Sequence, residues 1–191
     1  MSSSRIKGNW RAGWALDLHT TSSSINPDGS FTNTYTEIGE KLNQLKYRNN
    51  LSVVDSLAET ASNFIKELLV YKYLAAIVPI PPSKLDRPYQ PVFLLTEKIG
   101  ELVNLPAPTD YLTKNKPTQP LKEITDIDTR REQLSGAFSV RDNRFNGKYV
   151  LLFDDLYRSG ETLNAASSAL TERGGVSRVF VLTLTKTRVN R

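Results

Sequence analysis

The chain has 191 residues, of which 39% are hydrophobic and 24% charged, values typical of one soluble globular domain. It has no cysteine and a single histidine, which excludes disulfide frameworks, thiol nucleophiles and cysteine-based metal sites and disfavours Ser-His-Asp triads. The formal net charge of +5 suits an anionic partner, but the positive charges are scattered and also fit an ordinary soluble surface. With no apolar run near the roughly 20 residues that span a bilayer, and no signal-peptide core, we expect a cytoplasmic protein without a membrane partner.

The first 36 residues are polar and rich in turn formers, and they predict a small N-terminal cap, or hood. Trp10–Leu18 is typical of a strand, Asn26–Gly29 of a turn and Phe31–Tyr35 of a returning strand, which together predict a hairpin. Within this cap, His19 is expected either to pack on the sheet or to join a lid over a ligand, and packing is favoured. The lid would also use three nearby side chains: Trp10, Trp14 and Asp17.

Residues 37–191 predict the core of the same domain, so that the whole chain, 1–191, forms one unit. Apolar residues at helical spacing predict helices over 37–47, 52–72, 90–103 and 161–173. Apolar or alternating runs predict strands over 74–80, 110–113, 137–140, 148–153 and 176–185. This order is that of an α/β domain with a mainly parallel sheet flanked by helices. The long polar stretch 114–136 predicts a mobile functional loop, or else a solvated surface.

The most informative segment is Val150–Thr162, in which two acids follow an apolar strand and a small-residue turn opens a helix. Ligands of open α/β sheets bind at the carboxyl ends of strands, where Asp154 and Asp155 lie. The start of a helix binds phosphate, and Ser159 and Thr162 add hydroxyl donors. The segment therefore indicates a site for a phosphorylated sugar. The alternative is a capped helix preceded by two solvated acids.

Four apolar residues, two acids, three variable positions and Ser-Gly-x-Thr resemble the signature for 5-phosphoribosyl-1-pyrophosphate (PRPP) of type I phosphoribosyltransferases. Further motifs are similar to those of the ComF family of competence proteins, which is itself phosphoribosyltransferase-like. These motifs are Lys46-Tyr47-Arg48, Val78-Pro79-Ile80-Pro81, Arg87-Pro88-Tyr89-Gln90, Thr118-Gln119, Arg130-Arg131 and Gln133–Phe138. The resemblance covers about residues 38–186. It departs at the N-terminus, where ComF proteins commonly carry a cysteine zinc ribbon that this chain lacks.

The resemblance implies a type I phosphoribosyltransferase fold and a role for each motif. Asp154 and Asp155 would hold the ribose hydroxyls as the catalytic acids, and would contact a Mg²⁺ cofactor only through those hydroxyls or water. The 5-phosphate would be wrapped by Leu156, Tyr157, Arg158, Ser159, Gly160, Glu161 and Thr162. The pyrophosphate loop would contain Pro82, Ser83, Lys84 and Arg87. The mobile loop would supply four cations: Lys114, Lys116, Arg130 and Arg131.

The implied activity is transfer of the phosphoribosyl group from PRPP to an unidentified nucleophile, with release of pyrophosphate. Arg158 stays protonated and cannot act as a general base, so a neutral purine that depends on this loop for deprotonation is disfavoured. The alternatives are a non-catalytic PRPP or nucleotide sensor associated with DNA uptake, and a generic nucleotide-binding module. Nucleic acid is a less favoured partner than a small molecule, and a homodimer is compatible with the resemblance.

Overall fold

The computed structural model describes residues 3–83, 88–115 and 136–188. Its strands are β1 Ser4–Arg5, β2 Ala12–Leu18, β3 Thr20–Ile25, β4 Phe31–Tyr35, β5 Leu74–Pro79, β6 Leu112–Lys114, β7 Phe138–Val140, β8 Tyr149–Tyr157 and β9 Arg178–Lys186. Its α-helices are α1 Glu37–Tyr47, α2 Val54–Glu67, α3 Pro91–Val103 and α5 Glu161–Glu172, joined by short 3-10 helices at Leu51–Val53 and Tyr71–Tyr73. None of the helices in these ranges is both long and apolar enough to cross a membrane.

A five-stranded sheet in the order β1-β2-β9-β8-β5 forms the centre of the molecule. The four strands β2, β9, β8 and β5 run parallel, and the short β1 pairs antiparallel at one edge. This architecture confirms the predicted α/β class with its mainly parallel sheet. The strands are long apolar runs because both faces of the sheet are covered by helices.

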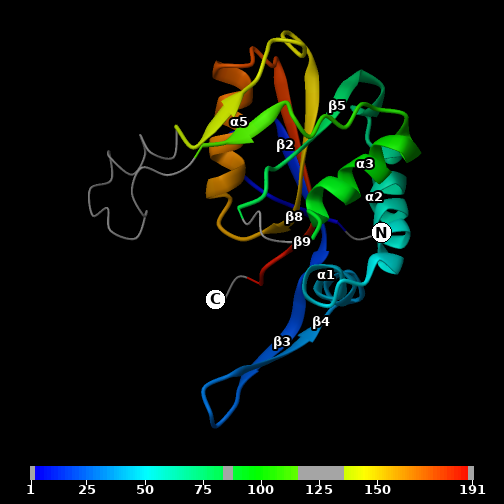
Figure 1. Cartoon of the computed structure of the whole chain (residues 1–191), viewed down its shortest axis with the longest axis vertical. Helices are drawn as coiled ribbons and strands as arrows, with labels where there is room; N and C mark the ends of the chain where they lie inside the picture. The colour runs from blue at the N-terminus through cyan, green and yellow to red at the C-terminus, as the bar shows by residue number, and fades with distance from the viewer. Residues whose placement is uncertain (1–2, 84–87, 116–135, 189–191) are drawn as a thin grey trace.

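Strand β8 shows how the two faces are filled, since neighbouring side chains point to opposite sides. Val150 and Leu152 pack on the face covered by α5, whereas Leu151 and Phe153 pack on the face covered by α1, α2 and α3 (Figure 1). All four side chains are fully buried. The sheet is therefore held between two apolar layers, and polar groups are expected only at its two ends.

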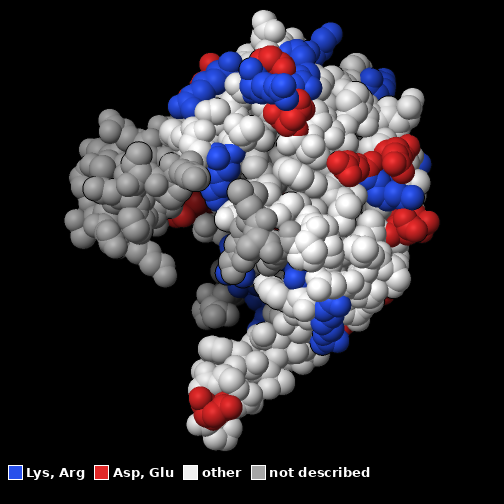
Figure 2. All heavy atoms as spheres, in the orientation of Figure 1, with Lys and Arg blue, Asp and Glu red and all other residues white. Residues whose placement is uncertain are grey.

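The predicted N-terminal hairpin is wrong in its pairing. Residues 12–18 do not pair with 31–35 but enter the central sheet, where β2 runs parallel to β9. The hairpin is formed instead by β3 and β4, which pair through Ile25 and Phe31 beside the turn. Figure 1 shows this arm projecting away from the sheet, and Asp28 is its one charged residue (Figure 2). An exposed two-stranded ribbon needs no apolar face, so the Ser and Thr residues of β3 lack the apolar alternation that predicts a strand.

The predicted helix 52–72 is too long, because α2 ends at Glu67 and Leu68 has an extended backbone. Leu69, which the pattern assigned to the apolar face, is 94% exposed. The predicted strand 148–153 is too short, because β8 continues to Tyr157, paired with β9 throughout. The second of these differences places the two acids inside the strand rather than in a loop.

Candidate functional site

The site arises from an offset between two neighbouring strands. The last pair between β5 and β8 is Pro79 with Phe153, after which β8 continues to Tyr157. The Ile80 N–H still donates to the Phe153 carbonyl at 2.9 Å, and the chain then turns away through Pro81 and Pro82. Proline cannot donate to the ladder, so a Pro-Pro step ends the pairing. This departure leaves an open crevice beside the second half of β8.

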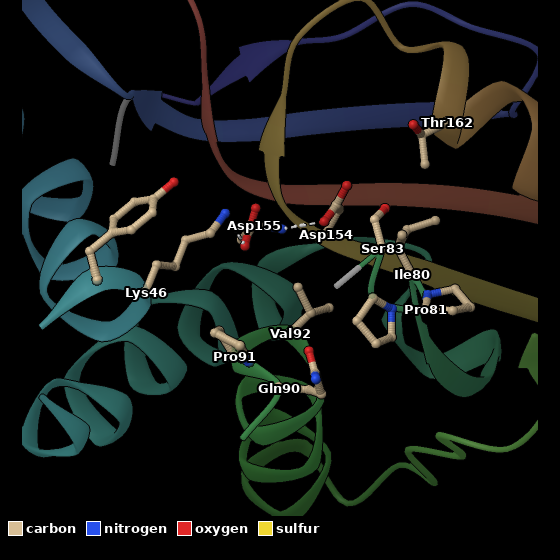
Figure 3. Close-up of a pocket in the computed structure, with 12 residues that line it drawn as sticks. Lys46, Ile80, Pro81, Ser83, Gln90, Pro91, Val92, Asp154, Asp155 and Thr162 are labelled. Carbon is tan, nitrogen blue, oxygen red and sulfur yellow. Dashed lines mark hydrogen bonds and ion pairs between the residues drawn. The ribbon is translucent and has the colours of Figure 1, made fainter. Parts of the chain in front are cut away.

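A cavity of about 250 Å³ occupies this crevice at the carboxyl edge of the sheet. Figure 3 shows residues from several separate segments facing it: α1, the turn after β5, the start of α3, β8 and the start of α5. The lining residues are Lys46, Tyr47, Ile80, Pro81, Pro82, Ser83, Gln90, Pro91, Val92, Asp154, Asp155 and Thr162. The carboxyl edge of a parallel sheet is where α/β proteins bind ligands, so the position agrees with the sequence prediction.

The acid pair reaches the cavity from both faces of the sheet, because consecutive strand residues point in opposite directions. Asp155 lies on the face of α1, where its Oδ2 is 2.8 Å from Lys46 Nζ. Asp154 points toward the other face, and its Oδ1 accepts from the Asp155 N–H at 2.9 Å. The side chains of Asp155 and Lys46 are only 10% and 19% exposed. The ion pair of Asp155 and Lys46 is therefore largely enclosed, and both acids line the cavity.

Asp154 has a strongly shifted pKa. Burial, followed by the negative charge of Asp155, raises the pKa of Asp154 from 3.8 to about 8, while Lys46 and Lys114 oppose the rise. At neutral pH, Asp154 therefore tends to hold a proton, and Asp155 is the acid that pairs with a cation. Across the sheet Asp154 is in register with Thr183, whose buried hydroxyl has no hydrogen-bond partner among the described residues. A protonated acid beside a hydroxyl can donate and accept at once, which suits a sugar diol.

The predicted phosphate segment divides into two parts. Thr162 lines the cavity, whereas the six residues before it do not. Tyr157 has a packing role, since its hydroxyl donates to the Lys7 carbonyl and its ring meets Trp10 edge-on. Gly160 precedes α5 with φ +82° and without a side-chain cap, a conformation that favours glycine. Of the other four, Leu156 is partly exposed, while Arg158, Ser159 and Glu161 are exposed. Phosphate binding by this segment stays a prediction.

The predicted pyrophosphate and mobile loops are only partly described. Pro82 and Ser83 line the cavity, and Lys114 of β6 reaches Ser83, with its Nζ donating to Oγ at 2.7 Å. Partial burial lowers the pKa of the Lys114 ammonium, and the charge of Asp154 opposes that effect. The structure thus brings Lys114 to the acid pair. The five other predicted cations lie outside the described residues: Lys84, Arg87, Lys116, Arg130 and Arg131.

Sequence reasoning assigned no site role to Lys46, Tyr47 or Gln90, although each belongs to a motif of the family resemblance. It also missed Pro91 and Val92, which open α3. The available signal was their position: Lys46 and Tyr47 end one amphipathic helix, and Gln90 precedes the start of another. The sequence pattern within each helix does not indicate that the end of that helix faces the acid pair.

The alternative interpretation of the N-terminal cap, a lid over a ligand, is not supported by the positions of Trp10, Trp14 and His19. Trp10 is buried, and Trp14 stacks on Phe180 with ring centroids 6.4 Å apart. His19 lies nearer the acids, with its Nδ1 3.2 Å from Thr185 Oγ1, and Thr185 in turn donates to the Asp155 carbonyl. Burial, followed by the charge of Lys46, lowers the pKa of His19 from 6.5. None of the three lines the cavity, so the packing interpretation holds for them.

No protein-family profile matches the chain. The chain is 27% identical to competence protein ComFC of Bacillus subtilis over 145 residues, which cover 76% of this chain and 58% of that protein. It is 28% identical to competence protein F of Haemophilus influenzae over 141 residues, which cover 70% of this chain and 61% of that protein. The chain thus spans about three fifths of the length of these curated relatives.

Two solved structures share the architecture. Adenine phosphoribosyl transferase from Trypanosoma brucei matches with a TM-score of 0.50 and 15% identity, covering 97% of this chain and 87% of that one. Glutamine PRPP amidotransferase from Bacillus subtilis matches with a TM-score of 0.50 and 18% identity, covering 84% of this chain and 35% of that one. The chain has the type I phosphoribosyltransferase fold, as the sequence predicts. At these identities the structural likeness establishes the fold alone.

Proposed function

We propose that this protein binds PRPP together with Mg²⁺ and transfers the phosphoribosyl group to a nucleophile, releasing pyrophosphate. The observation that carries the proposal is the convergence of the acid pair, Thr162 and Ser83 on one cavity at the carboxyl edge of the sheet. Acids suit sugar hydroxyls, and the start of a helix suits a phosphate. The type I phosphoribosyltransferase fold supports the choice of a pentose phosphate among sugar phosphates.

The ribose and its 5-phosphate would bind along the line from the acid pair to α5. Asp154 and Asp155 would take the ribose hydroxyls, and Thr162 with the first backbone N–H groups of α5 would take the phosphate. The first N–H groups of a helix have no intrahelical acceptor; Gly160 supplies no side-chain cap, and Ser159 Oγ accepts from the Glu161 N–H only at 3.5 Å. Anchoring the sugar at both ends fixes its anomeric carbon, which lowers the entropic cost of the reaction.

The pyrophosphate would leave toward the turn after β5, where Ser83 lies beside Lys114. In the reaction the bond between the anomeric carbon and the pyrophosphate oxygen breaks, and its electron pair leaves with pyrophosphate. The nucleophile forms the new bond at that carbon and gives up its proton to solvent or to a neighbouring base. A cation held near the departing oxygens stabilises their growing negative charge. In this proposal Lys114, whose Nζ donates to Ser83 Oγ at 2.7 Å, would provide that charge.

The residues present fit Mg²⁺ only as an ion carried by the substrate. Among the described residues no group of three or more acidic or histidine side chains comes together. Mg²⁺ prefers phosphate oxygens and water with few protein ligands, so Asp154 and Asp155 would contact it through ribose hydroxyls or water. When bound, the ion would supply positive charge to the pyrophosphate.

The similarity to two competence proteins favours a second candidate, a non-catalytic protein that binds the same ligand as an effector. In that case PRPP would bind without turnover and would alter the affinity for another molecule, such as a nucleic acid. The exposed Arg158 guanidinium cannot remove a proton from a neutral purine, which disfavours that class of acceptor.

The test is calorimetric and thermal-shift titration with PRPP and Mg²⁺, comparing the wild-type protein with Asp154→Asn/Asp155→Asn. A ligand that binds only the folded state raises its melting temperature, so we expect a rise that the double variant loses. Asp142→Asn is the matched control, because it removes an acid before β8, away from the cavity. A wild-type protein that PRPP does not stabilise would refute both candidates.

A second assay separates the two candidates. Pyrophosphate release is measured with PRPP, Mg²⁺ and a panel of amines, purines and pyrimidines. Release with any acceptor supports the transferase. PRPP binding without release supports the effector role, and nucleic-acid affinity that falls steeply with salt would identify the partner as a polyanion. Rapid conversion of hypoxanthine or adenine would contradict the argument from Arg158.

A further inference from the structure

Lys46 and Asp155 form the most enclosed ion pair of the described residues. Their side chains are 19% and 10% exposed, whereas every other ion pair there has at least one partner that is more than a third exposed. Breaking a buried pair is costly, but an apolar pair of similar size often serves stability equally well. A charged pair that lines a cavity (Figure 3) therefore calls for an explanation beyond stability.

The backbone that carries Lys46 is fixed from both ends of α1. At the start, Thr36 Oγ1 accepts from the Gly39 N–H at 3.1 Å and donates to the Leu18 carbonyl at 2.6 Å, which ties the helix to β2. At the end, the Leu45 carbonyl accepts from the Tyr89 hydroxyl, which ties it to the segment before α3. A helix held at both ends presents its last lysine to β8 in a defined position.

Several charged groups surround Asp155, and they come from different elements. Asp154 precedes it on β8, Lys46 comes from α1, and Lys114 of β6 lies on the Asp154 side. His19 follows β2 and interacts electrostatically with Asp155, Lys46 and Arg158. Of these cations, Lys46 makes the ion pair with Asp155. Its ammonium lies 2.8 Å from one carboxylate oxygen, Oδ2, and the side chain of Asp155 lines the cavity.

We propose that Lys46 is a positioning residue of the phosphoribosyl site, which holds the Asp155 carboxylate charged and turned so that its second oxygen can accept a ribose hydroxyl. This inference rests on the proposed function and adds a residue from outside the acid and phosphate motif. Without Lys46, the Asp155 carboxylate would have lost its ion-pair partner in an enclosed space, and Asp155 would rotate or take up a proton. Either change removes the acceptor that the ribose needs.

The test compares Lys46→Met, Lys46→Arg and Lys41→Met, with ribose 5-phosphate as the probe in calorimetry. Methionine keeps the length of the side chain without its charge, and arginine keeps the charge. Lys41 is the matched control, because it lies on the same helix and pairs with Glu37 at 2.7 Å, but Glu37 is 82% exposed. We expect Lys46→Met to weaken binding by about tenfold or more, since a charge-assisted hydrogen bond is lost. Lys46→Arg should restore most of the affinity, and Lys41→Met should leave it unchanged.

A second readout needs no ligand. His19 is the only histidine of the chain, so its ring resonances can be titrated by NMR without overlap. The charge of Lys46 helps to lower the pKa of His19, so Lys46→Met should raise that pKa and Lys41→Met should not. This measurement reports where the ammonium lies in the folded protein, and it also shows that each variant is folded.

The outcomes separate this inference from the proposed function. If the wild-type protein binds ribose 5-phosphate and Lys46→Met binds it equally well, the positioning role is refuted and the proposed function stands. An unchanged His19 pKa in Lys46→Met would refute the placement of Lys46 whatever the ligand does. If the wild-type protein binds neither PRPP nor ribose 5-phosphate, the proposed function fails and the role of Lys46 in it fails as well.

Discussion

The two ends of strand β8 both carry charged residues, but only one end surrounds a cavity. Before the strand begins, Arg144 pairs with Asp142 and Asp110, and all three side chains are more than a third exposed. Figure 2 shows such basic and acidic side chains interleaved on the open surface. Past Phe153, the pair of Asp155 and Lys46 is largely enclosed and lines the cavity. The same residue types therefore form a solvated surface at one end and a candidate site at the other.

The pKa values at the two ends move in opposite directions. Hydrogen bonds from Arg144 lower the pKa values of Asp110 and Asp142, whereas burial and then the charge of Asp155 raise that of Asp154. An ion pair that is exposed to solvent contributes little to the stability of the fold. An acid that is buried next to another acid remains ready to change its protonation when a ligand arrives. Enclosure, rather than the number of charges, distinguishes the site.

The largest expected effect comes from leaving the enclosed lysine without its partner. Asp155→Ala should lower the free energy of unfolding by about 3 kcal/mol, because the Lys46 ammonium would stay buried and uncompensated. Urea unfolding measures the change. The double variant Lys46→Met/Asp155→Leu should recover most of the stability without recovering ribose 5-phosphate binding. Equal losses in the single and the double variant would contradict the buried ion pair.

The pH dependence of stability should differ between wild type and Asp154→Asn. The folded pKa of Asp154, about 8, lies above the unfolded value of 3.8, so between these values the folded protein holds a proton that the unfolded chain releases. The contribution of protonated Asp154 to the free energy of unfolding is therefore complete below about pH 4, and it is lost as the pH rises toward 8. Unfolding curves across this range should show the decline in wild type and not in Asp154→Asn.

The opposite end of β8 provides the contrast for this experiment. The pKa of Asp142 is lowered, so its contribution is present above its unfolded value of 3.8 and is lost as the pH falls through the folded value. Relative to wild type, Asp142→Asn should therefore change stability at neutral pH and not in strong acid. If the free energy of unfolding has the same pH dependence in wild type and in Asp154→Asn, Asp154 is ionised in the folded protein and its raised pKa is refuted.

Two glycines that flank β8 allow a smaller comparison. Gly147 and Gly160 both have positive φ, +71° and +82°, but an added Cβ meets nothing at Gly147 and lies 3.0 Å from the Tyr157 ring at Gly160. Each alanine variant should lose about 1–2 kcal/mol from the left-handed backbone alone, and Gly160→Ala should lose more. Unfolding curves measure the difference, and calorimetry should show that only Gly160→Ala weakens ribose 5-phosphate binding. Equal binding by both variants would argue against phosphate at the start of α5.

The sequence predicts those parts of the fold and the site that depend on local patterns. The apolar runs at 74–80 and 148–153 and the Gly-opened helix at 161–173 correspond to β5, β8 and α5, because buried strands and amphipathic helices have their own periodicity. The acid pair and Thr162 were found for the same reason, since they are close in sequence and follow a recognisable strand.

The remaining features depend on contacts between distant segments. Nothing within residues 12–18 shows that their partner is β9, near the other end of the chain. The offset between β5 and β8 depends on where the Pro81–Pro82 step turns, and it decides that the acids stand beside a crevice. Lys46 reaches Asp155 only because α1 is tied to β2 and Tyr89. These relations are properties of packing, and no single segment contains them.

The smallest expected effect is at the first residue of β8, where Arg178 Nε donates to the Tyr149 hydroxyl at 3.0 Å. Tyr149→Phe removes this hydrogen bond and keeps the ring, over which the Arg178 guanidinium lies at 5.6 Å. We expect a loss of about 0.5 kcal/mol in the free energy of unfolding, the lower end for an exposed hydrogen bond, and no change in ribose 5-phosphate binding by calorimetry. A loss of binding comparable to that of Lys46→Met would mean that the two ends of β8 are coupled, because Tyr149 does not contact the cavity. The contrast between a solvated end and an enclosed end would then no longer account for where the ligand binds.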